Sequence, residues 1–460
     1  MEQLLKKLAG YRYGSAAGSD IARLELYQAI CAMGLAGDDE ESTSRAFELQ
    51  RGAILPVLVT DCKSSCEDIQ KSAIELLGQL VAMASSCEGP AFQPNQASSL
   101  WNAVARVLDN EDSQRMVKVM ALFAISRNTM DPDLVAPSVP QLAPAVARSM
   151  RMESTVARQQ SAAAIHRLLG AVPGALAMCD PGTTDNPQED IFWVRCLLRL
   201  CFDDAVSVRG DALKAAEKAV SLGVLRGNPG VSAWVLEALK DGRLSQGIKR
   251  VLFYDVNSPA ALAAPSGADP LVQGSHASDS SAGTAHEQKS PRHATSQRVK
   301  QAIRVWAVYL SLADPGNLLK TKDLEGKRLL DVGTGLFAWL SSGGKSAGGR
   351  DDVRVQAAEA WEMFSVNVMA QISRDEAKKV AHMFLRALTR WVLKGKGVVR
   401  EAAMTSLAGI VASFPSTMLE PLWATAREKT SSAKAWRRSC AMWLVRTAAA
   451  AILFSTTLPG

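Results

Sequence analysis

The feature that most constrains the fold of this chain is a short helical pattern that recurs along nearly its whole length. Each copy has an acidic or polar turn, then a β-branched residue beside an arginine or lysine, then an alanine one helical turn later. The alanines of the seven copies are Ala73, Ala121, Ala162, Ala212, Ala357, Ala402 and Ala441. Successive alanines are 48, 41, 50, 145, 45 and 39 residues apart. Apart from the 145, these distances scatter around the roughly 40 to 47 residues of a HEAT or armadillo repeat.

The residue types within each copy suit a stack of helix pairs. An acidic residue before a helix caps its free N–H groups and complements its dipole, and a small alanine lets neighbouring helices approach closely. Apolar residues recur at helical spacing, for example on one face of the segment 69–81, and no comparable run alternates with period two. A helix pair cannot bury its apolar face alone, so repeats must stack. We therefore predict an all-α fold, a HEAT/armadillo-type α-solenoid of stacked antiparallel helix pairs.

Composition excludes several classes of protein. Of 460 residues, 47% are hydrophobic and 21% charged, which supplies a core and excludes disorder throughout. No run of about 18 uncharged apolar residues occurs and the N-terminus has no signal-peptide pattern, so we expect a soluble protein without membrane contact. Eight cysteines are too dilute for a disulfide framework and, with five histidines, do not complete a zinc site. We expect no metal and no cofactor.

Composition also changes along the chain. Residues 257–297 are rich in Ser, Ala, Gly, Pro and His, and we expect a disordered insertion there. It separates N-terminal repeats at 1–256 from C-terminal repeats at 298–446, and 447–460 is a tail or a truncated end. Without the insertion, the long gap has room for about two more repeats, one containing a helix over 299–312.

Charge is distributed unevenly between the two sets of repeats. From Arg298 onward there are 24 Lys and Arg against 13 Asp and Glu, whereas residues 1–297 hold 28 against 33. The basic half could hold a polyanion such as nucleic acid, and the acidic half is left for protein partners. An ordinary solvated surface is the alternative.

Four helical stretches, taken in order, resemble one known family. In 117–130 an aromatic follows Ala-Leu and a basic-polar turn follows Ile-Ser; 208–217 contains Val-Arg-Gly-Asp-Ala; 303–310 has a tryptophan after Ile-Arg-Val; and 353–364 contains Ala-Glu-Ala-Trp. Together they resemble the N-terminal HEAT-repeat domain of the Rap-interacting factor (Rif) family of telomere-associated, replication-timing proteins. The resemblance spans roughly Ile21 to Val411. The segment 341–350 and the insertion are additions to the family's pattern.

This resemblance implies a non-enzymatic chromatin scaffold in the nucleus, on the chromosome and at the telomere. Its expected partners are DNA, held by backbone contacts, telomeric or chromatin proteins, and type-one protein phosphatase. Its expected roles are telomere maintenance, replication timing and the choice of double-strand-break repair.

The strongest basic surface predicted from the residues lies on a helix over 375–394. Four of its cations fall within about 60° of one helical face, next to an apolar face. Further cations after it could extend a groove that tracks phosphates without reading bases. The predicted DNA-binding residues are Lys379, Arg386, Arg390, Lys394, Lys396, Arg400, Lys434, Arg437 and Arg438. Trp361 and Trp391 are expected in the core rather than as stacking platforms.

Short motifs suggest regulation. Arg250, Val251 and Phe253 match the Arg-Val-x-Phe pattern that docks type-one phosphatase as an added strand, although the end of an amphipathic helix explains the same residues. Ser290, before a proline, and Ser296, before a glutamine, are candidate phosphorylation sites in the insertion.

Two other functions compete with the scaffold. One is a cytosolic HEAT-repeat adaptor, either a transport receptor or a phosphatase regulatory subunit. The other is an S-adenosylmethionine-dependent methyltransferase, because 328–336 resembles a glycine-rich nucleotide-cradling turn, although its third glycine is replaced by Leu336 and no strand–helix series surrounds it. A loop between repeat helices is the plainer interpretation of that segment.

Overall fold

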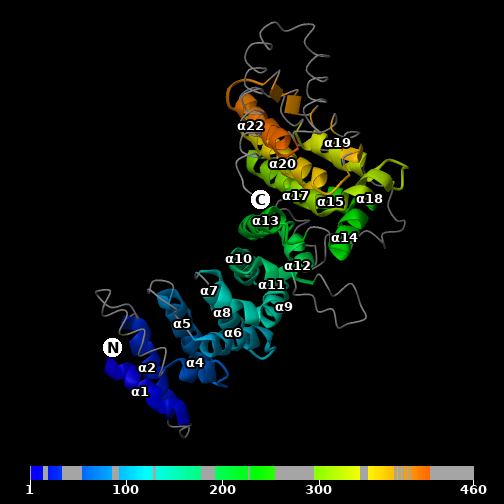
Figure 1. The fold of residues 1–460 in the computed structure, drawn as a ribbon. Helices are drawn as coiled ribbons and strands as arrows, with labels where there is room; N and C mark the ends of the chain where they lie inside the picture. The colour runs from blue at the N-terminus through cyan, green and yellow to red at the C-terminus, as the bar shows by residue number, and fades with distance from the viewer. Residues whose placement is uncertain are drawn as a thin grey trace, which may run out of the picture. The chain divides into compact units, whose positions relative to one another are not determined.

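Helices make up nearly all of the regular structure in a computed structural model of the chain (Figure 1). The structure describes residues 2–13, 19–33, 54–84, 93–127, 131–177, 192–225, 228–253, 295–341, 351–373 and 395–414, with scattered positions between 375 and 392. Within these residues the only β-pairing is an isolated antiparallel bridge between Lys322 and Arg328. The chain divides into two compact units, one through Arg226 and the other from Gly227 onward.

The first unit is a double row of helices in which neighbours in sequence pack as pairs. Its inner row is α2 (Ser19–Met33), α5 (Glu67–Ala84), α7 (Arg115–Ser126), α10 (Thr155–Ala171) and α13 (Val206–Ser221). Its outer row is α4 (Leu55–Asp61), α6 (Pro94–Asp109), α9 (Val139–Ser149) and α12 (Phe192–Leu200). Each inner helix packs against the next, and each outer helix packs against the inner helix that follows it. The short elements are α1 (Glu2–Ala9), η1 (Gly10–Tyr13), α8 (Pro132–Val135), η3 (Ala136–Ser138) and α11 (Pro173–Ala177).

The second unit repeats this arrangement. Its helices are α14 (Pro229–Lys240), α15 (Arg243–Phe253), α17 (Ser296–Leu312), α18 (Pro315–Lys320), α19 (Leu329–Ser341), α20 (Asp351–Met369) and α22 (Gly397–Ser413). Helices α15, α17, α20 and α22 pack in succession, and α14 and α19 both pack against α17. The predicted all-α, HEAT-type repeat architecture is therefore confirmed.

The register of the repeats follows from one position that six helices share. The fourth residue of α5, α7, α10, α13, α20 and α22 is polar or basic, and three residues later comes a small buried side chain. Those small residues are Ala73, Ala121, Ser161, Ala212, Ala357 and Ala403, all fully buried. The sequence pattern selected Ala162 and Ala402 instead of Ser161 and Ala403, one residue out of register. The equivalent in α17 is Ala302, also fully buried, so α17 supplies a repeat within the long gap.

The boundary between units differs from the one drawn on composition. Helices α14 and α15, placed by sequence in the 1–256 segment, group with α17 and α19 because they pack against them. Thr295 is the N-cap of α17 and its hydroxyl accepts the Arg298 N–H, so 295–297 belong to a helix rather than to the insertion. Residues 257–294, 447–460 and the copy ending at Ala441 lie outside the described residues.

An aromatic cluster forms the core of the second unit. Trp306, on α17, stacks on Trp361 of α20 at 5.9 Å between ring centroids and contacts Phe337 of α19 at 4.6 Å. The indole Nε1 of Trp306 donates to the carbonyl of Gly333 at 2.8 Å. Trp361 is buried, as predicted, and Trp391 is half-buried with its ring 6.2 Å from that of Phe337.

The methyltransferase interpretation of 328–336 is wrong. The segment opens helix α19, and Gly333 lies inside that helix, where a Cβ would come within 2.7 Å of Leu310 Cδ1. The glycine permits close helix packing and a buried hydrogen bond, and it does not follow a strand. The plainer expectation of a loop is wrong for the same reason.

The described residues bear on three expectations from the sequence, which concern membrane spans, disulfides and metal sites. The described helices include none that is both long and apolar enough to span a bilayer. The five cysteines within those residues are free thiols. No three His, Cys, Asp or Glu side chains among them gather in a way that could hold a metal ion.

Candidate functional site

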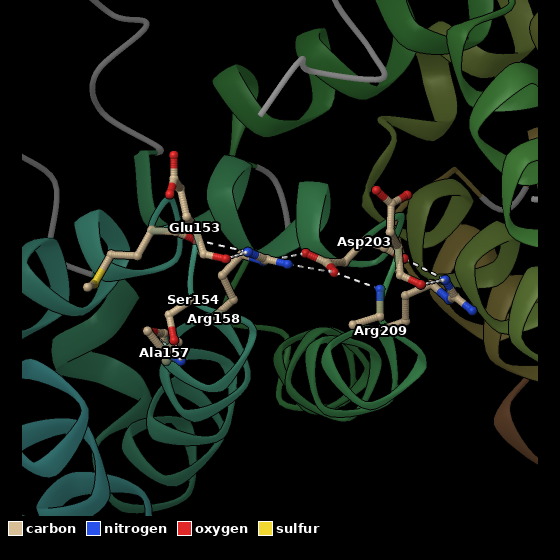
Figure 2. A network of polar contacts seen from close by, with 10 residues as sticks. Glu153, Ser154, Ala157, Arg158, Asp203 and Arg209 are labelled. Carbon is tan, nitrogen blue, oxygen red and sulfur yellow. Dashed lines mark hydrogen bonds and ion pairs between the residues drawn. The ribbon is translucent and has the colours of Figure 1, made fainter. Parts of the chain in front are cut away.

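The N-terminal edge of the inner row is held together by arginines. Arg158, the fourth residue of α10, donates through Nη1 to the carbonyls of Met152 at 3.0 Å and Glu153 at 2.6 Å. Its other nitrogens reach the next repeat, with Nε 2.6 Å from Asp203 Oδ2 and Nη2 3.2 Å from Oδ1 (Figure 2). One guanidinium thus links the turn before α10 to the turn before α13.

The bond from this position to the turn before its helix recurs in register. Arg209, the fourth residue of α13, donates to the carbonyls of Asp203 and Asp204. In α22, Arg400 Nε donates to the Gly395 carbonyl at 3.1 Å, and in α5 the amide of Gln70 donates to the Cys62 carbonyl at 2.8 Å. These donors satisfy backbone carbonyls of the turn before their own helix and so fix that turn, and Arg158 also reaches a carboxylate of the next repeat.

A related anchor joins the first repeats. Arg23 on α2 lies 2.9 Å from Asp61 Oδ1, and the Tyr27 hydroxyl donates to Oδ2 at 2.8 Å. Burial raises the pKa of the Asp61 carboxyl, while the Tyr27 hydrogen bond and the Arg23 charge oppose that rise. Apart from Arg23 Nε, which is buried without a hydrogen-bond partner, the charged groups of this cluster are paired within the fold.

The opposite, C-terminal edge of the inner row carries a set of basic residues, of which Lys214 is paired with Asp211. We define the cationic row as Arg127 at the end of α7, His166 and Arg167 on α10, and Lys214 and Lys218 on α13. These helices pack side by side. Arg127, Arg167 and Lys218 stand nine residues after the register position of their helices, so the row follows the repeat itself.

Local contacts hold the cations of the row in place. The guanidinium of Arg127 lies 4.1 Å above the centre of the Phe123 ring. Arg167 Nε donates to the Ser126 carbonyl at 3.1 Å, which ties α10 to the end of α7. Lys218 extends to α10, where a Cβ added to Gly170 would lie 2.6 Å from its Nζ. The glycine therefore leaves room for this ammonium between α10 and α13.

The pKa of His166 reflects the net positive charge of the row. Burial lowers the pKa of His166, and Lys218, Arg167 and Lys214 lower it further, against partial compensation by Asp211. Asp211 pairs with Lys214 at 2.9 Å. Among the described residues, no carboxylate pairs with Arg127, Arg167 or Lys218, so these three charges remain available to a ligand. Cations near helix C-termini also complement the helix dipole. That interaction does not use all of their N–H groups, which can still donate to a ligand.

The structure describes only part of the surface predicted from sequence. Lys396 and Arg400 are exposed at the start of α22. Lys379, Arg386, Arg390, Lys394, Lys434, Arg437 and Arg438 lie outside the described residues, so the predicted groove stays a prediction. The cationic row was missed because it lies in the net-acidic half and contributes only one or two cations per repeat. Its signal in the sequence is a basic residue at one register position in three consecutive repeats.

The phosphatase motif falls in a helix. Residues 250–253 form the end of α15, with Val251 buried and Arg250 half-buried. This placement matches the alternative interpretation, in which these residues end an amphipathic helix. Docking as an added strand would require the last turn of α15 to unwind. Ser296 is the first residue of α17 and is half-buried, whereas Ser290 lies outside the described residues.

Comparison with known proteins gives similarity in structure only. No family model and no curated protein matches the sequence. Among solved structures, the Rif1 N-terminal domain from Saccharomyces cerevisiae has a TM-score of 0.57 at 10% identity, covering 92% of this chain and 41% of that one. The same yeast domain in complex with DNA has a TM-score of 0.58 at 11% identity, covering 94% and 41%. This chain thus spans about two fifths of those structures, and at such low identity the likeness shows the fold alone.

Proposed function

We propose that the chain is a non-enzymatic helical-repeat scaffold that binds DNA through the cationic row. The observation that carries this proposal is the set of three cations, Arg127, Arg167 and Lys218, that have no carboxylate partner among the described residues and follow one another on packed helices. A solved structure of similar fold contains DNA, which supports the same ligand class here.

The spacing of the row suits a phosphate backbone. Packed helix axes lie about 8 to 10 Å apart, so three successive inner helices distribute their cations over about 20 Å. Duplex DNA carries about one charge per 1.7 Å of its axis, so several phosphates fall within that span. Backbone contacts of this kind position DNA without reading its bases, and binding should therefore tolerate changes of sequence.

The finer roles are proposals on the resemblance to the Rif family. They are nuclear, chromosomal and telomeric location, telomere maintenance, replication timing, choice of double-strand-break repair, and recruitment of telomeric or chromatin proteins. The basic residues from Lys379 to Arg438 would extend DNA contact into the second unit. Recruitment of type-one phosphatase has the least support, because Val251 is buried in α15.

A salt series of gel shifts on duplex DNA tests the DNA-binding proposal. Each phosphate contact contributes about −0.9 to the slope of log affinity against log salt. Replacing Arg127, Arg167 and Lys218 together by glutamine should make the slope shallower by about 2.7. A matched control replaces three exposed cations away from the row, Lys63, Arg106 and Arg115, and should leave most of the slope intact.

The outcomes separate the candidate functions. If the unaltered chain binds no duplex DNA at low salt, the proposal fails and the cytosolic adaptor becomes the better account. If DNA binds but the row and control variants lose affinity equally, the binding surface is not the cationic row.

A further inference from the structure

The N-terminal edge of the first unit exposes a line of apolar side chains. Met116 on α7, Val156 on α10 and Val206 on α13 are 53%, 46% and 52% exposed. All three lie in the first turn of consecutive, packed inner helices. We call these three residues the apolar edge. It lies at the end of the helices opposite to the cationic row.

Folding does not require apolar residues at these positions. The adjacent residues Val117 and Ala157 are fully buried and already supply the core contacts of their turns. At other helices in this register the exposed second residue is acidic in α5 (Asp68) and α20 (Asp352), polar in α17 (Gln297) and apolar only in α22 (Val398). An acid is what a solvated helix N-terminus favours, so three exposed apolar residues in succession indicate contact with a partner.

The turns beside the apolar edge are acidic. Residues 109–115, 151–155 and 203–207 contain six Asp and Glu against two Arg. Asp109 pairs with Arg148 and Asp203 with Arg158, so these two charges are balanced within the fold. Beyond these pairs the turns hold Glu111, Asp112 and Glu153, and these three acids outnumber the two arginines of these turns. A partner that complements this edge therefore carries both apolar and basic side chains.

Repeat spacing indicates the conformation of that partner. Inner helices packed about 8 to 10 Å apart set the distance between successive apolar residues. A polyproline II segment rises about 3.1 Å per residue with three residues per turn, so every third side chain returns to one face after about 9 Å. A β-strand puts every third side chain on the opposite face, and an α-helix covers the same distance only with a spacing of about seven residues.

We propose that the apolar edge docks an extended, polyproline-II-like protein segment with an apolar residue at every third position and basic residues between. This proposal is independent of DNA binding. The apolar side chains seat on Met116, Val156 and Val206, while lysines or arginines of the segment face the acidic turns.

Fluorescence anisotropy with the full chain and labelled synthetic peptides tests this inference. The probe peptide repeats Leu-Pro-Lys four times. One control has the same composition with the leucines moved out of the three-residue spacing, and another replaces every lysine by glutamate. We expect the probe to bind at least tenfold more tightly than either control. Equal binding of the three peptides, or no binding of the probe, would overturn the proposal.

Substitutions locate the binding surface. Val156→Asp combined with Val206→Asp should weaken binding of the probe at least tenfold without lowering the melting temperature, because both side chains are exposed. Val398→Asp is the matched control, since Val398 is also exposed in a helical first turn but lies in the second unit. Unchanged probe affinity in the double variant refutes the edge as the site. A loss of duplex DNA affinity in that variant, with peptide affinity kept, would assign the edge to nucleic acid instead.

Discussion

Replacing Asp203 by alanine breaks the link between two repeats of the first unit. The carboxylate accepts both Nε and Nη2 of Arg158 and also the Ala205 N–H at 2.9 Å, which orders the turn before α13 (Figure 2). The side chains of Arg158 and Asp203 are only 19% and 8% exposed, so water replaces little of what is lost.

The expected cost lies between two limits. Breaking a buried ion pair costs about 3 to 5 kcal/mol, because one charge is left unpaired, while an exposed pair contributes about 0 to 1 kcal/mol. Arg158 keeps its bonds to two backbone carbonyls, which places Asp203→Ala near the lower end of the buried range. Adding the turn bond to Ala205, we expect a loss of about 3 kcal/mol in the free energy of unfolding. For a unit of this size that corresponds to a fall in melting temperature of roughly 6 to 12 °C.

Thermal unfolding and hydrogen exchange measure this loss. Asp109→Ala is the matched control, because the Arg148–Asp109 pair also joins neighbouring repeats but its side chains are 52% and 39% exposed. We expect the control to cost about 1 kcal/mol or less. Asp203→Ala should also speed amide exchange in the turns before α10 and α13. Equal melting temperatures for the two variants would refute the reasoning that the Arg158–Asp203 pair stabilises the contact between these repeats.

Three further predictions concern other sites. Gly333→Ala should cost about 1 to 3 kcal/mol in thermal unfolding, because its Cβ would lie 2.7 Å from the buried Leu310 side chain; an unchanged melting temperature would contradict that packing. Burial raises the pKa of Glu362, so its ionised form weakens the fold and stability is lost as pH rises through that pKa. Glu362→Gln should therefore raise the melting temperature at pH 8 but not at pH 4, and a rise of equal size at both would argue against this cause. The pKa of His166 lies below its usual value, and nearby DNA phosphates would favour its protonation. DNA affinity should then increase from pH 7.5 to pH 5.5 more in the unaltered chain than in His166→Gln, and parallel pH profiles would contradict it.

Helical periodicity predicted the architecture well because the core of each repeat is encoded locally. Val117 and Ala121, or Val353 and Ala357, mark buried positions of one helix without knowledge of its neighbours. The register was predicted one residue out where alanines are adjacent, as at Ala402 and Ala403. There the bond from a basic side chain to a preceding carbonyl decides which alanine is equivalent, and such bonds are visible only in three dimensions.

Short motifs predicted less of the structure than helical periodicity did. The Arg-Val-x-Phe pattern at 250–253 coincides with helical spacing of Ile248 and Val251, both buried in α15, and phosphatase docking there stays a prediction. The interpretation of 328–336 as a glycine-rich turn was wrong, since Gly333 serves close packing inside a helix. The cationic row was hidden for another reason. Its members come from separate repeats, so only stacking brings them together.

Protection of Lys218 from chemical acetylation tests the central claim most directly. The chain is treated with a limiting acetylating reagent, with and without duplex DNA at low salt, and modification of each lysine is measured by mass spectrometry. We predict that DNA protects Lys218 severalfold, that added salt removes the protection, and that the exposed Lys63 and Lys240 react equally in both samples. Equal modification of Lys218 with and without bound DNA would contradict binding through the cationic row.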